Sequence, residues 1–496
     1  MLVMKFGGTS VGSVGALQKV IEIVRNGRQK GHNIVVVVSA MSGVTDLLLT
    51  AAHQAESGDE TAAHTARLRI AGKHGEAIAH FLGDTLEGAA VKSEIDSLLN
   101  EFESLCHGIH VLGELTPRAL DVIGGMGERM SMPQVAALLN QMGLPAQGVA
   151  ATDLIVTDRR FGAAVPLPVE TAAKTKAGIL PILQKGIIPV VTGFIAATHD
   201  GIPTTLGRGG SDYSATILGS ALEADEVWIW TDVNGVMTTD PRIVPEACSI
   251  AHLSYAEISE LSFFGAKVLH SQAIRPARRS GIPVRILNTF QPDHSGTLIT
   301  AETKECHKAV KAVAAIRNMS LINIEGAGMA GIPGVAGRTF TAVGRTDSNV
   351  LMISQASSEQ SICFVVPTSD VPKVVHSLEA ELVREIERRD LEQIQWEDEV
   401  VVLAVVGAGM KGTPGISGRL FGALGRSKIN VIAIAQGSSE FNISLVIPRS
   451  EADQAVRAIH QEFELHQDDS KTYLKTFLDP DSLCKIKYPF AKDPLL

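Results

Sequence analysis

The sequence predicts an α/β protein, in which a three-layer αβα sheet domain is followed by two ferredoxin-like (βαββαβ) domains. Up to about residue 300, apolar and β-branched runs alternate with segments of helical periodicity, which is typical of a mainly parallel sheet covered on both faces. Beyond that point the chain repeats itself with an offset of 81 residues. The 496 residues are 45% hydrophobic, which is enough material for several separate cores.

Short apolar runs and periodic segments define the expected strands and helices of the first domain. The expected central strands are Leu2–Phe6, Ile34–Ser39, Ile188–Val191 and Val227–Trp230. The expected helices are Ala16–Arg28, Pro133–Met142, Ala172–Gln184 and Asp212–Leu222. Residues 55–115 are polar and rich in alanine, without a strand-like run, and predict a helical insertion or a lid over the mouth of the sheet.

The C-terminal part of the chain contains two related units. Between residues 326–359 and 407–440, 20 of the 34 aligned positions are identical without a gap, which indicates duplication rather than chance. Each unit has the order β-α-β-β-α, the start of a ferredoxin-like motif. Turn-rich and polar residues place a domain boundary near residue 305. We therefore expect domains at 1–305, 313–392 and 398–470, followed by a tail at 471–496.

Glycines in these repeats match the dinucleotide fingerprint G-x-G-x-x-G, at Gly326 and again at Gly407. The pattern alone is weak. The units are too short for a doubly wound domain, and the acid expected on the ribose is inconsistent, because Asp347 in one unit is Lys428 in the other. We therefore predict no NAD binding here.

Charge and cysteine content restrict the class of protein. The net charge of −10 disfavours general affinity for nucleic acid, which needs clustered Lys and Arg. The five cysteines form no C-x-x-C pair, so neither a disulfide framework nor a zinc ribbon is expected, and we predict no metal site built from protein ligands. The N-terminus does not resemble a signal peptide and no apolar run is long enough to cross a membrane. These features predict a cytoplasmic protein without a membrane partner.

The first ten residues contain a possible anion site. Lys5 lies near the end of an apolar strand, and Gly7 and Gly8 leave bare backbone where a helix is about to begin. Backbone N–H groups, a helix N-terminus and a lysine together suit anionic oxygen. Thr9 and Ser10 are candidates for the helix cap. A tight turn without any ligand is an equally good interpretation of these residues alone.

Polar and glycine-rich segments follow other expected strands, where open α/β sheets bind ligands. Ser39 to Thr45 supplies neutral donors after the second strand. Glu128 follows three glycines and opens a helix, where it either caps N–H groups or binds an ammonium group. Arg208 lies in a glycine loop that suits a clamp on carboxylate or phosphate.

Further candidate residues surround these segments. Ser211 and Asp212 begin the helix after the Arg208 loop, and Thr231 and Asp232 follow the strand Val227–Trp230. The loop continues through Met237 to Arg242, and Lys267 lies downstream beside small residues. Lysines and arginines among glycine loops, with few acids or histidines, suit phosphoryl transfer. The absence of a Walker A sequence and of a His-Arg-Asp loop excludes several other classes of kinase.

These segments resemble the motifs of the aspartate kinases of the amino-acid kinase family, and the duplicated tail is similar to paired ACT domains. The resemblance rests on the following segments: Lys5-Phe-Gly-Gly-Thr-Ser10, Gly207-Arg-Gly-Gly-Ser-Asp212, Thr231-Asp-Val-Asn-Gly235, Thr238-Thr-Asp-Pro-Arg242 and Phe264-Gly-Ala-Lys-Val-Leu-His270. It covers the chain to about residue 470. It implies ATP-dependent phosphorylation of the β-carboxylate of L-aspartate, the first step toward lysine, threonine and methionine. Because the chain ends at Leu496, we expect no homoserine dehydrogenase domain.

The resemblance implies a role for each matching residue. It places aspartate on Ser39, Thr45, Glu128, Arg208 and Ser211, with Arg208 on the α-carboxylate and Glu128 on the α-ammonium. It places ATP on Lys5, Gly7, Gly8, Ser10, Thr231, Asp232, Met237, Arg242 and Lys267. Lys5, Asp212 and Lys267 are the implied catalytic residues. Met237 stands where many relatives have Tyr, which weakens that contact. Mg²⁺ is expected to bridge the phosphates.

For the tail, the resemblance implies feedback control. It places a small amino-acid effector, threonine first and lysine second, on Gln355, Gln436, Asn349 and Asn430. It also implies a homodimer or a higher homo-oligomer through the ACT domains, and dimerisation alone would equally explain the two glutamines. Two alternatives remain, namely a non-catalytic amino-acid sensor with a kinase-like fold and a related amino-acid kinase that acts on another carboxylate.

Overall fold

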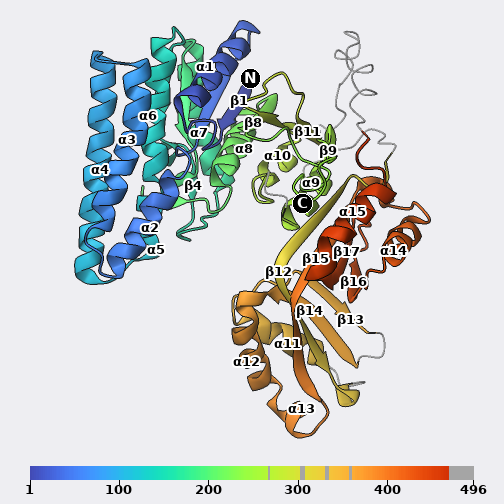
Figure 1. Cartoon of the computed structure of the whole chain (residues 1–496). Helices are drawn as coiled ribbons and strands as arrows, with labels where there is room; N and C mark the ends of the chain where they lie inside the picture. The colour runs from blue at the N-terminus through green and yellow to red at the C-terminus, as the bar shows by residue number, and fades with distance from the viewer. Residues whose placement is uncertain (266–268, 302–307, 330–333, 357–359, 468–496) are drawn as a thin grey trace.

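The computed structural model describes residues 1–265, 269–301, 308–329, 334–356 and 360–467. An αβα domain forms the N-terminal part, and a smaller sheet with helices forms the C-terminal part (Figure 1). As the sequence predicts, the chain is an α/β protein in which a three-layer αβα sheet domain precedes two ferredoxin-like units.

The first domain is built on an eight-stranded sheet with the order β3-β5-β2-β1-β8-β10-β11-β9. Its strands are β1 (Leu2–Phe6), β2 (Ile34–Val38), β3 (Ala146–Val149), β5 (Ile188–Thr192), β8 (Glu226–Thr231), β9 (His252–Ser254), β10 (Val284–Asn288) and β11 (Thr297–Thr300). Neighbours pair in parallel except β10 with β11. The four predicted strands are confirmed, with ends that differ by one residue at most.

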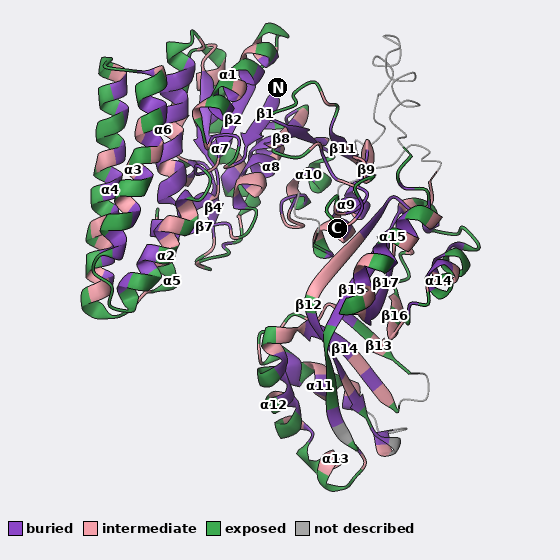
Figure 2. Cartoon of the chain, in the orientation of Figure 1, coloured by how far each residue is buried: buried purple, intermediate pink, exposed green. Residues whose placement is uncertain are grey.

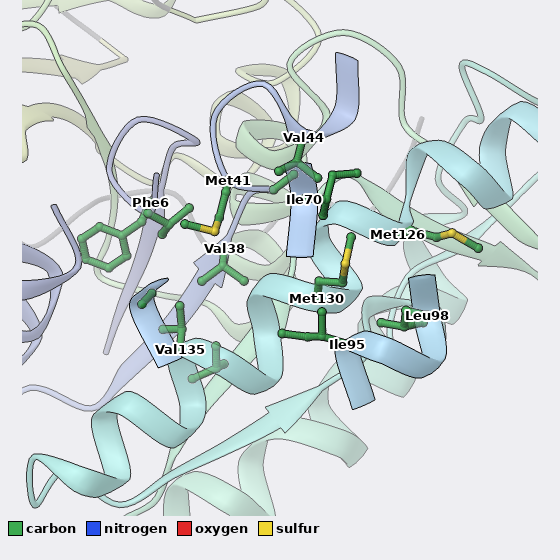
Figure 3. Close-up of a cluster of buried hydrophobic side chains, with 14 of the residues drawn as sticks. Phe6, Val38, Met41, Val44, Ile70, Ile95, Leu98, Met126, Met130 and Val135 are labelled. Carbon is green, nitrogen blue, oxygen red and sulfur yellow. The ribbon is translucent and has the colours of Figure 1, made fainter. Parts of the chain in front are cut away.

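Alternate residues of the central strands face opposite layers, as the two-residue period requires. Met4 and Phe6 of β1 join one apolar core, whereas Val3 joins another on the opposite face. Figure 3 shows the first core, in which Phe6 and Val38 meet side chains from the surrounding helices. Its helices are α1 (Val14–Gln29), α2 (Val44–Glu56), α3 (Ala62–Phe81), α4 (Leu86–Leu112), α5 (Pro117–Gly124) and α6 (Met126–Gln141).

Residues 55–115 are helical, as predicted, and the helices α3 and α4 pack beside α2 and α6 rather than closing over the sheet (Figures 1 and 2). Their buried faces, including Ile70 and Leu99, belong to the same core as the sheet. The lid interpretation is therefore not supported, because this insertion is a layer of the domain. Helix α1 is capped by Ser13, whose Oγ accepts a hydrogen bond from Ala16 N at 3.3 Å, so the prediction of a Thr9 or Ser10 cap is wrong.

The second face carries helices that lead toward the C-terminal part of the chain. They are α7 (Pro168–Gln184), α8 (Gly210–Leu222), α9 (Tyr255–Phe263) and α10 (Arg275–Ser280). A small sheet of β4 (Val156–Thr157), β6 (Ile195–Thr198) and β7 (Pro203–Thr205) lies beside this layer and ends at the Arg208 loop. Helix α6 begins at Met126, before the predicted start at Pro133, so that Glu128 falls in its first turn.

The two repeats share one six-stranded sheet with the order β13-β14-β12-β15-β17-β16. Its strands are β12 (Ala312–Glu325), β13 (Met352–Gln355), β14 (Ser361–Pro367), β15 (Gln393–Val406), β16 (Ala433–Gln436) and β17 (Asn442–Pro448). Its helices are α11 (Val335–Gly344), α12 (Val371–Glu381), α13 (Val383–Glu387), α14 (Ile416–Arg426) and α15 (Ala452–Glu462).

The two long strands β12 and β15 belong to both repeats. The first part of β12 pairs with the last part of β15, and its last part pairs with both β14 and the first part of β15. The last part of β15 pairs in turn with β17. The first unit thus includes the first part of β15, which precedes the second repeat. The second unit includes the first part of β12, which precedes the first repeat. The division into domains at 313–392 and 398–470 remains a prediction. Strands β12 and β15 each contribute to both units, so the units are not separate in space.

Helix α9 of the first domain contacts the repeats through a buried carboxylate. Glu257 is fully buried and its Oε2 lies 3.0 Å from Lys311 Nζ. Its Oε1 accepts a hydrogen bond from Ala408 N at 2.8 Å. Nearby, Thr238 Oγ1 lies 3.0 Å from His460 Nε2 of α15. These contacts fix the second repeat against the domain that carries the candidate site.

Candidate active site

A cavity of about 480 Å³ lies in the first domain at the carboxyl ends of β1 and β2. This is the edge at which open α/β sheets bind ligands. Seven of the predicted catalytic and substrate-binding residues line it: Lys5, Ser39, Thr45, Glu128, Arg208, Ser211 and Asp212. The structure thus brings together residues that are spread over more than 200 positions of the sequence.

Three helices begin at this cavity. Thr45 lies in the first turn of α2, Glu128 in that of α6, and Ser211 with Asp212 in that of α8. Helix N-termini carry partial positive charge and unpaired N–H groups, so they attract anions. The N-cap residues of all three helices are glycines that make no side-chain cap.

Lys5 is the buried cation of the site. Its Nζ lies 2.6 Å from Asp212 Oδ1, and both side chains are about nine-tenths buried. Residue Lys5 comes from the central strand β1, and Asp212 comes from the first turn of α8. The carboxylate fixes the direction of the ammonium group, whose other hydrogens remain available. This pair can therefore present a positive charge to an anionic ligand without moving.

Arg208 is exposed at the cavity, and no side-chain partner is found for it among the described residues. Gly207 and Gly209 on either side have φ of 74° and 69°, in the left-handed region that favours glycine. A Cβ at Gly209 would lie 2.6 Å from His270 Cβ, so a larger residue does not fit there. The glycines hence allow a sharp loop that leaves the guanidinium ready for a bidentate anion.

Glu128 is the buried acid of the site. It is 3% exposed, and its Oε2 has no hydrogen-bond partner among the described residues. Burial raises the pKa of Glu128 to about 8, although the positive charge of Lys5 acts in the opposite direction. A buried carboxyl oxygen without a partner is costly. It is consistent with a site that a cationic group of a ligand completes.

The glycine turn after β1 lies beside this cavity. Gly7 N donates to Trp230 O at 3.0 Å, which joins the turn to the end of β8. A Cβ at Gly8 would lie 2.9 Å from Ala40 O, so the close approach requires glycine. Ser10 is fully buried, and its Oγ lies 2.7 Å from Thr289 Oγ1. Its hydroxyl joins the turn to the end of β10 in this structure.

The other predicted nucleotide-binding residues lie after β8. Thr231 ends this strand, and its Oγ1 donates to Asp232 Oδ1 at 3.2 Å. Met237 forms an isolated β-bridge with Ser249. Arg242 is exposed and its guanidinium lies 2.6 Å from Asp240 Oδ2, so it does not reach the cavity here. Lys267 lies outside the described residues.

Two residues of the cavity wall carry no signal in the sequence and were not predicted. Asp121 of α5 is buried and accepts hydrogen bonds from Gly162 and Thr205. Phe194 has φ of 65°, which is unusual for an aromatic residue, and its N–H donates to Ser214 Oγ at 3.0 Å. No local motif marks either one, because both owe their position to distant partners.

The predicted effector residues occupy equivalent positions in the two repeats. Gln355 ends β13 and Gln436 ends β16, the two outer strands of the six-stranded sheet, and both are exposed. Asn349 and Asn430 are exposed in the segments before these strands, and Asn430 N donates to Glu451 Oε2 at 3.1 Å. The geometry leaves these polar groups accessible to solvent.

Two further kinds of feature are absent from the described ranges. Among those residues, no group of three or more His, Cys, Asp and Glu side chains is arranged to hold a metal ion. In the same part of the chain, no helix is both long enough and apolar enough to cross a bilayer.

Comparison with known protein families gives matches in both parts of the chain. Residues 1–288 match the amino acid kinase family, and residues 322–382 and 403–463 each match an ACT domain. The two ACT matches coincide with the two repeats of the sequence.

Curated relatives include bifunctional proteins and aspartokinases without a second named activity. A bifunctional aspartokinase/homoserine dehydrogenase 1, chloroplastic, of Arabidopsis thaliana is 39% identical over 93% of this chain and 51% of its own length. The chain thus spans about half the length of such relatives. Aspartokinase 2, chloroplastic, of the same plant is 32% identical over 93% of this chain and 84% of its own length.

Solved structures agree with these relatives. E. coli aspartokinase III in complex with aspartate and ADP, in the R-state, is 30% identical, with a TM-score of 0.79 over 93% of this chain and 99% of its own. The same enzyme in complex with lysine and aspartate, in the T-state, gives a TM-score of 0.75 over the same shares. The chain belongs to the amino acid kinase family, among the aspartokinases that carry ACT domains.

Proposed function

We propose that this protein transfers the γ-phosphoryl group of ATP to the β-carboxylate of L-aspartate and forms 4-phospho-L-aspartate. The observation that carries the proposal is the convergence of Lys5, Arg208 and Glu128 on one cavity where three helices begin. Two cations and three helix N-termini suit an anionic substrate and the charge of a phosphoryl group. The buried acid suits an ammonium group on the same substrate.

The cavity orients aspartate through its two α-substituents. Arg208 binds the α-carboxylate with a bidentate pair of hydrogen bonds, which lysine could not form. Glu128 binds the α-ammonium and loses its proton as it does so, because the cation lowers the pKa that burial raises. Ser39, Thr45 and Ser211 supply neutral donors between these two groups. The β-carboxylate is then directed toward Lys5.

The chemical step needs no general base, since the attacking β-carboxylate is already anionic. One of its oxygens forms a bond to the γ-phosphorus, the bond from that phosphorus to the β–γ bridging oxygen breaks, and ADP leaves. Lys5 neutralises the charge on the phosphoryl oxygens, and Asp212 holds the ammonium group of Lys5 in position. This contribution is mainly positioning and electrostatics.

The proposal also assigns residues to ATP and a role to Mg²⁺. The turn of Gly7 and Gly8 offers backbone to the phosphates, and Thr231 and Asp232 lie at the adjoining end of β8. Mg²⁺ neutralises the phosphates when it is bound. Lys267 and Arg242 remain proposed contacts with the nucleotide.

Release of ADP measured by a coupled assay tests the proposal, with Mg²⁺, ATP and either L-aspartate or L-glutamate. Aspartate-dependent release is expected. Turnover with glutamate but not aspartate would instead indicate a related amino-acid kinase. Calorimetric binding of amino acids without any turnover would indicate a non-catalytic sensor.

The ACT pair is proposed to bind an inhibitory amino acid, threonine or lysine, at Gln355, Gln436, Asn349 and Asn430. It is also proposed to pair with a second copy of the chain in a homodimer or a higher homo-oligomer. Ile353 and Ile434, at equivalent positions of the outer strands, are both nearly half exposed, which supports burial of this surface in an oligomer. Inhibition titrated separately with each amino acid, and molar mass from light scattering, test the two parts. A cytoplasmic location is part of the proposal.

A further inference from the structure

Asp121 lies in α5, the helix that precedes the helix of Glu128. Its side chain is 3% exposed and lines the cavity together with Arg208 and Glu128. Neither the predicted motifs nor the proposed chemical step uses it. Burial raises the pKa of Asp121, and hydrogen bonds from Thr205 and Gly162 act in the opposite direction. Every partner of its side chain among the described residues is a donor, which suits a carboxylate.

The carboxylate of Asp121 joins two segments that are far apart in sequence. Gly162 N lies 2.9 Å from Oδ1 and 3.0 Å from Oδ2. Thr205 N donates to Oδ2 at 3.0 Å and Thr205 Oγ1 donates to Oδ1 at 2.6 Å. The same segments are also joined directly, because Ala164 N donates to Thr205 O at 2.9 Å. The clamp therefore fixes the end of β7 against the loop around Gly162.

Arg208 follows this clamped point by three residues. Between them, Gly207 adopts a φ of 74°, and a Cβ there would lie 3.1 Å from Gly162 O. The direction in which the chain leaves Thr205 thus sets the direction of the Arg208 loop. At its other end, α5 leads into the helix of Glu128, since Gly125 N donates to Asp121 O at 3.1 Å.

We propose that Asp121 is a positioning residue for recognition of the substrate α-carboxylate, acting through Arg208. The inference rests on the proposed function, because it takes aspartate as the substrate. An asparagine here retains one acceptor oxygen but replaces the other with an NH₂ group that faces a backbone N–H. The loop then relaxes, and the guanidinium is less often in the orientation that a bidentate contact needs.

Asp121→Asn tests this role, with Asp158→Asn as a matched control. Asp158 also accepts hydrogen bonds from backbone amides of the same loop, Arg160 N at 3.2 Å and Val165 N at 2.9 Å, but it does not line the cavity. We expect Asp121→Asn to raise the KM for L-aspartate about tenfold or more, with the KM for ATP and kcat changed about threefold at most. Asp158→Asn should leave all three near the wild-type values.

Two further measurements separate positioning from a general structural effect. β-Alanine is aspartate without its α-carboxylate, so its inhibition constant should be unchanged by Asp121→Asn. The substitution should also have little further effect in an Arg208→Ala background, since both changes act on one contact. Equal loss of aspartate and β-alanine affinity, or full additivity with Arg208→Ala, would overturn the inference. If Asp121→Asn fails to fold, Asp121→Glu, which keeps the carboxylate, replaces it in the same comparison.

The outcome also separates this inference from the proposed function. Calorimetry of L-aspartate binding in the absence of nucleotide measures the same contact without turnover. A wild-type chain that binds aspartate without phosphorylating it would contradict the proposed function, and an affinity about tenfold weaker in Asp121→Asn would still support the role of Asp121. A chain that neither binds nor phosphorylates aspartate would contradict both.

Discussion

Lys5 and Lys311 are both buried lysines that face a carboxylate, and their surroundings differ. Lys5 lies 2.6 Å from Asp212 at the cavity, whereas Lys311 lies 3.0 Å from Glu257 at the junction of the kinase domain with the repeats. Asp212 has a cavity beside it. Glu257 is surrounded by donors, from Ser254 and Ala408 as well as Lys311. The Lys5–Asp212 pair is therefore accessible to a ligand, whereas the Lys311–Glu257 pair is fully enclosed by protein groups.

The glycine turns beside these pairs differ in the same way. Gly8 approaches Ala40 O in a turn that borders the cavity. Gly407 matches the dinucleotide fingerprint better, yet a Cβ there would lie 2.2 Å from Ala309 O, and the next amide is bound by Glu257. Gly407 and Gly409 allow close contact with the segment that precedes β12. A glycine pattern thus indicates that another group approaches the backbone closely. A neighbouring charge and a cavity distinguish a turn that binds a ligand from one that packs against protein.

The largest expected effect is that of Lys5→Met on turnover. Removal of the cation at the transferred phosphoryl group should lower kcat by about a hundredfold to a thousandfold. The melting temperature should fall less than in Lys311→Met, because Asp212 borders the cavity and lies at the N-terminus of α8, where negative charge is stabilised. Steady-state kinetics and thermal melting of the same preparation measure both. Unchanged turnover would refute the role of Lys5.

Lys311→Met is the matched change at the closed pair. It leaves Glu257 charged, buried and without its cation, which costs about 3–5 kcal/mol when a buried pair is broken. The free energy of unfolding from urea titration should fall accordingly, while kcat at low temperature stays within about threefold of wild type. If Lys311→Met instead lost turnover and kept its stability, the contrast between the two pairs would be wrong.

Gly8→Ala and Gly407→Ala extend the comparison to the turns. Gly8→Ala should raise the KM for ATP about tenfold, because the new Cβ displaces backbone that borders the cavity. Gly407→Ala should leave the KM for ATP unchanged and lower the melting temperature by several degrees. Gly418→Ala is the control, since a Cβ there meets no atom within 4 Å. The opposite assignment of effects would show that the repeats contain the nucleotide site.

An effect of similar size is expected in the dependence of aspartate binding on pH. Glu128 has a raised pKa of about 8, so it is largely neutral below that pH and ionised above it. Since the ionised form binds the α-ammonium, the KM for aspartate should fall about tenfold between about pH 7 and about pH 9. Glu128→Gln should abolish this dependence and raise the KM throughout. A KM that rises with pH in the wild type would contradict the role of Glu128.

The same shift has a consequence for stability. Because the pKa of Glu128 is higher in the folded protein than its ordinary value of 4.5, ionisation opposes folding. The unliganded protein should lose stability as the pH rises from about 4.5 through about 8, and Glu128→Gln should remove that component. Thermal melting across this range, with and without aspartate, measures it.

Much of the fold and of the site could be predicted because both follow from local patterns. Buried parallel strands appear as apolar runs, and their carboxyl ends meet at one edge of the sheet, so this pattern predicts that Lys5 and Ser39 lie close together. Arg208 was added to them by its glycine loop and by the resemblance to the aspartate kinases. The duplication likewise indicated two ferredoxin-like units, which the resemblance identified as ACT domains. In each of these cases, the signal lies within a few neighbouring residues.

The remaining features depend on contacts between distant segments. The two repeats align without a gap, and this alignment does not reveal that they share the strands β12 and β15. Glu257 looks like part of a capping box, and only the docked repeat reveals its second role. Asp121 likewise resembles any acid of a short helix until Gly162 and Thr205 are placed around it.

Trapping of the acyl phosphate with hydroxylamine tests the central claim most directly. An acyl phosphate reacts with hydroxylamine to give a hydroxamate, so the wild-type protein with Mg²⁺, ATP and L-aspartate should form the β-hydroxamate of aspartate in equal amount to the ADP released. Lys5→Met should lose both products together. Release of ADP without the hydroxamate, or formation of the hydroxamate by Lys5→Met at the wild-type rate, would contradict the account.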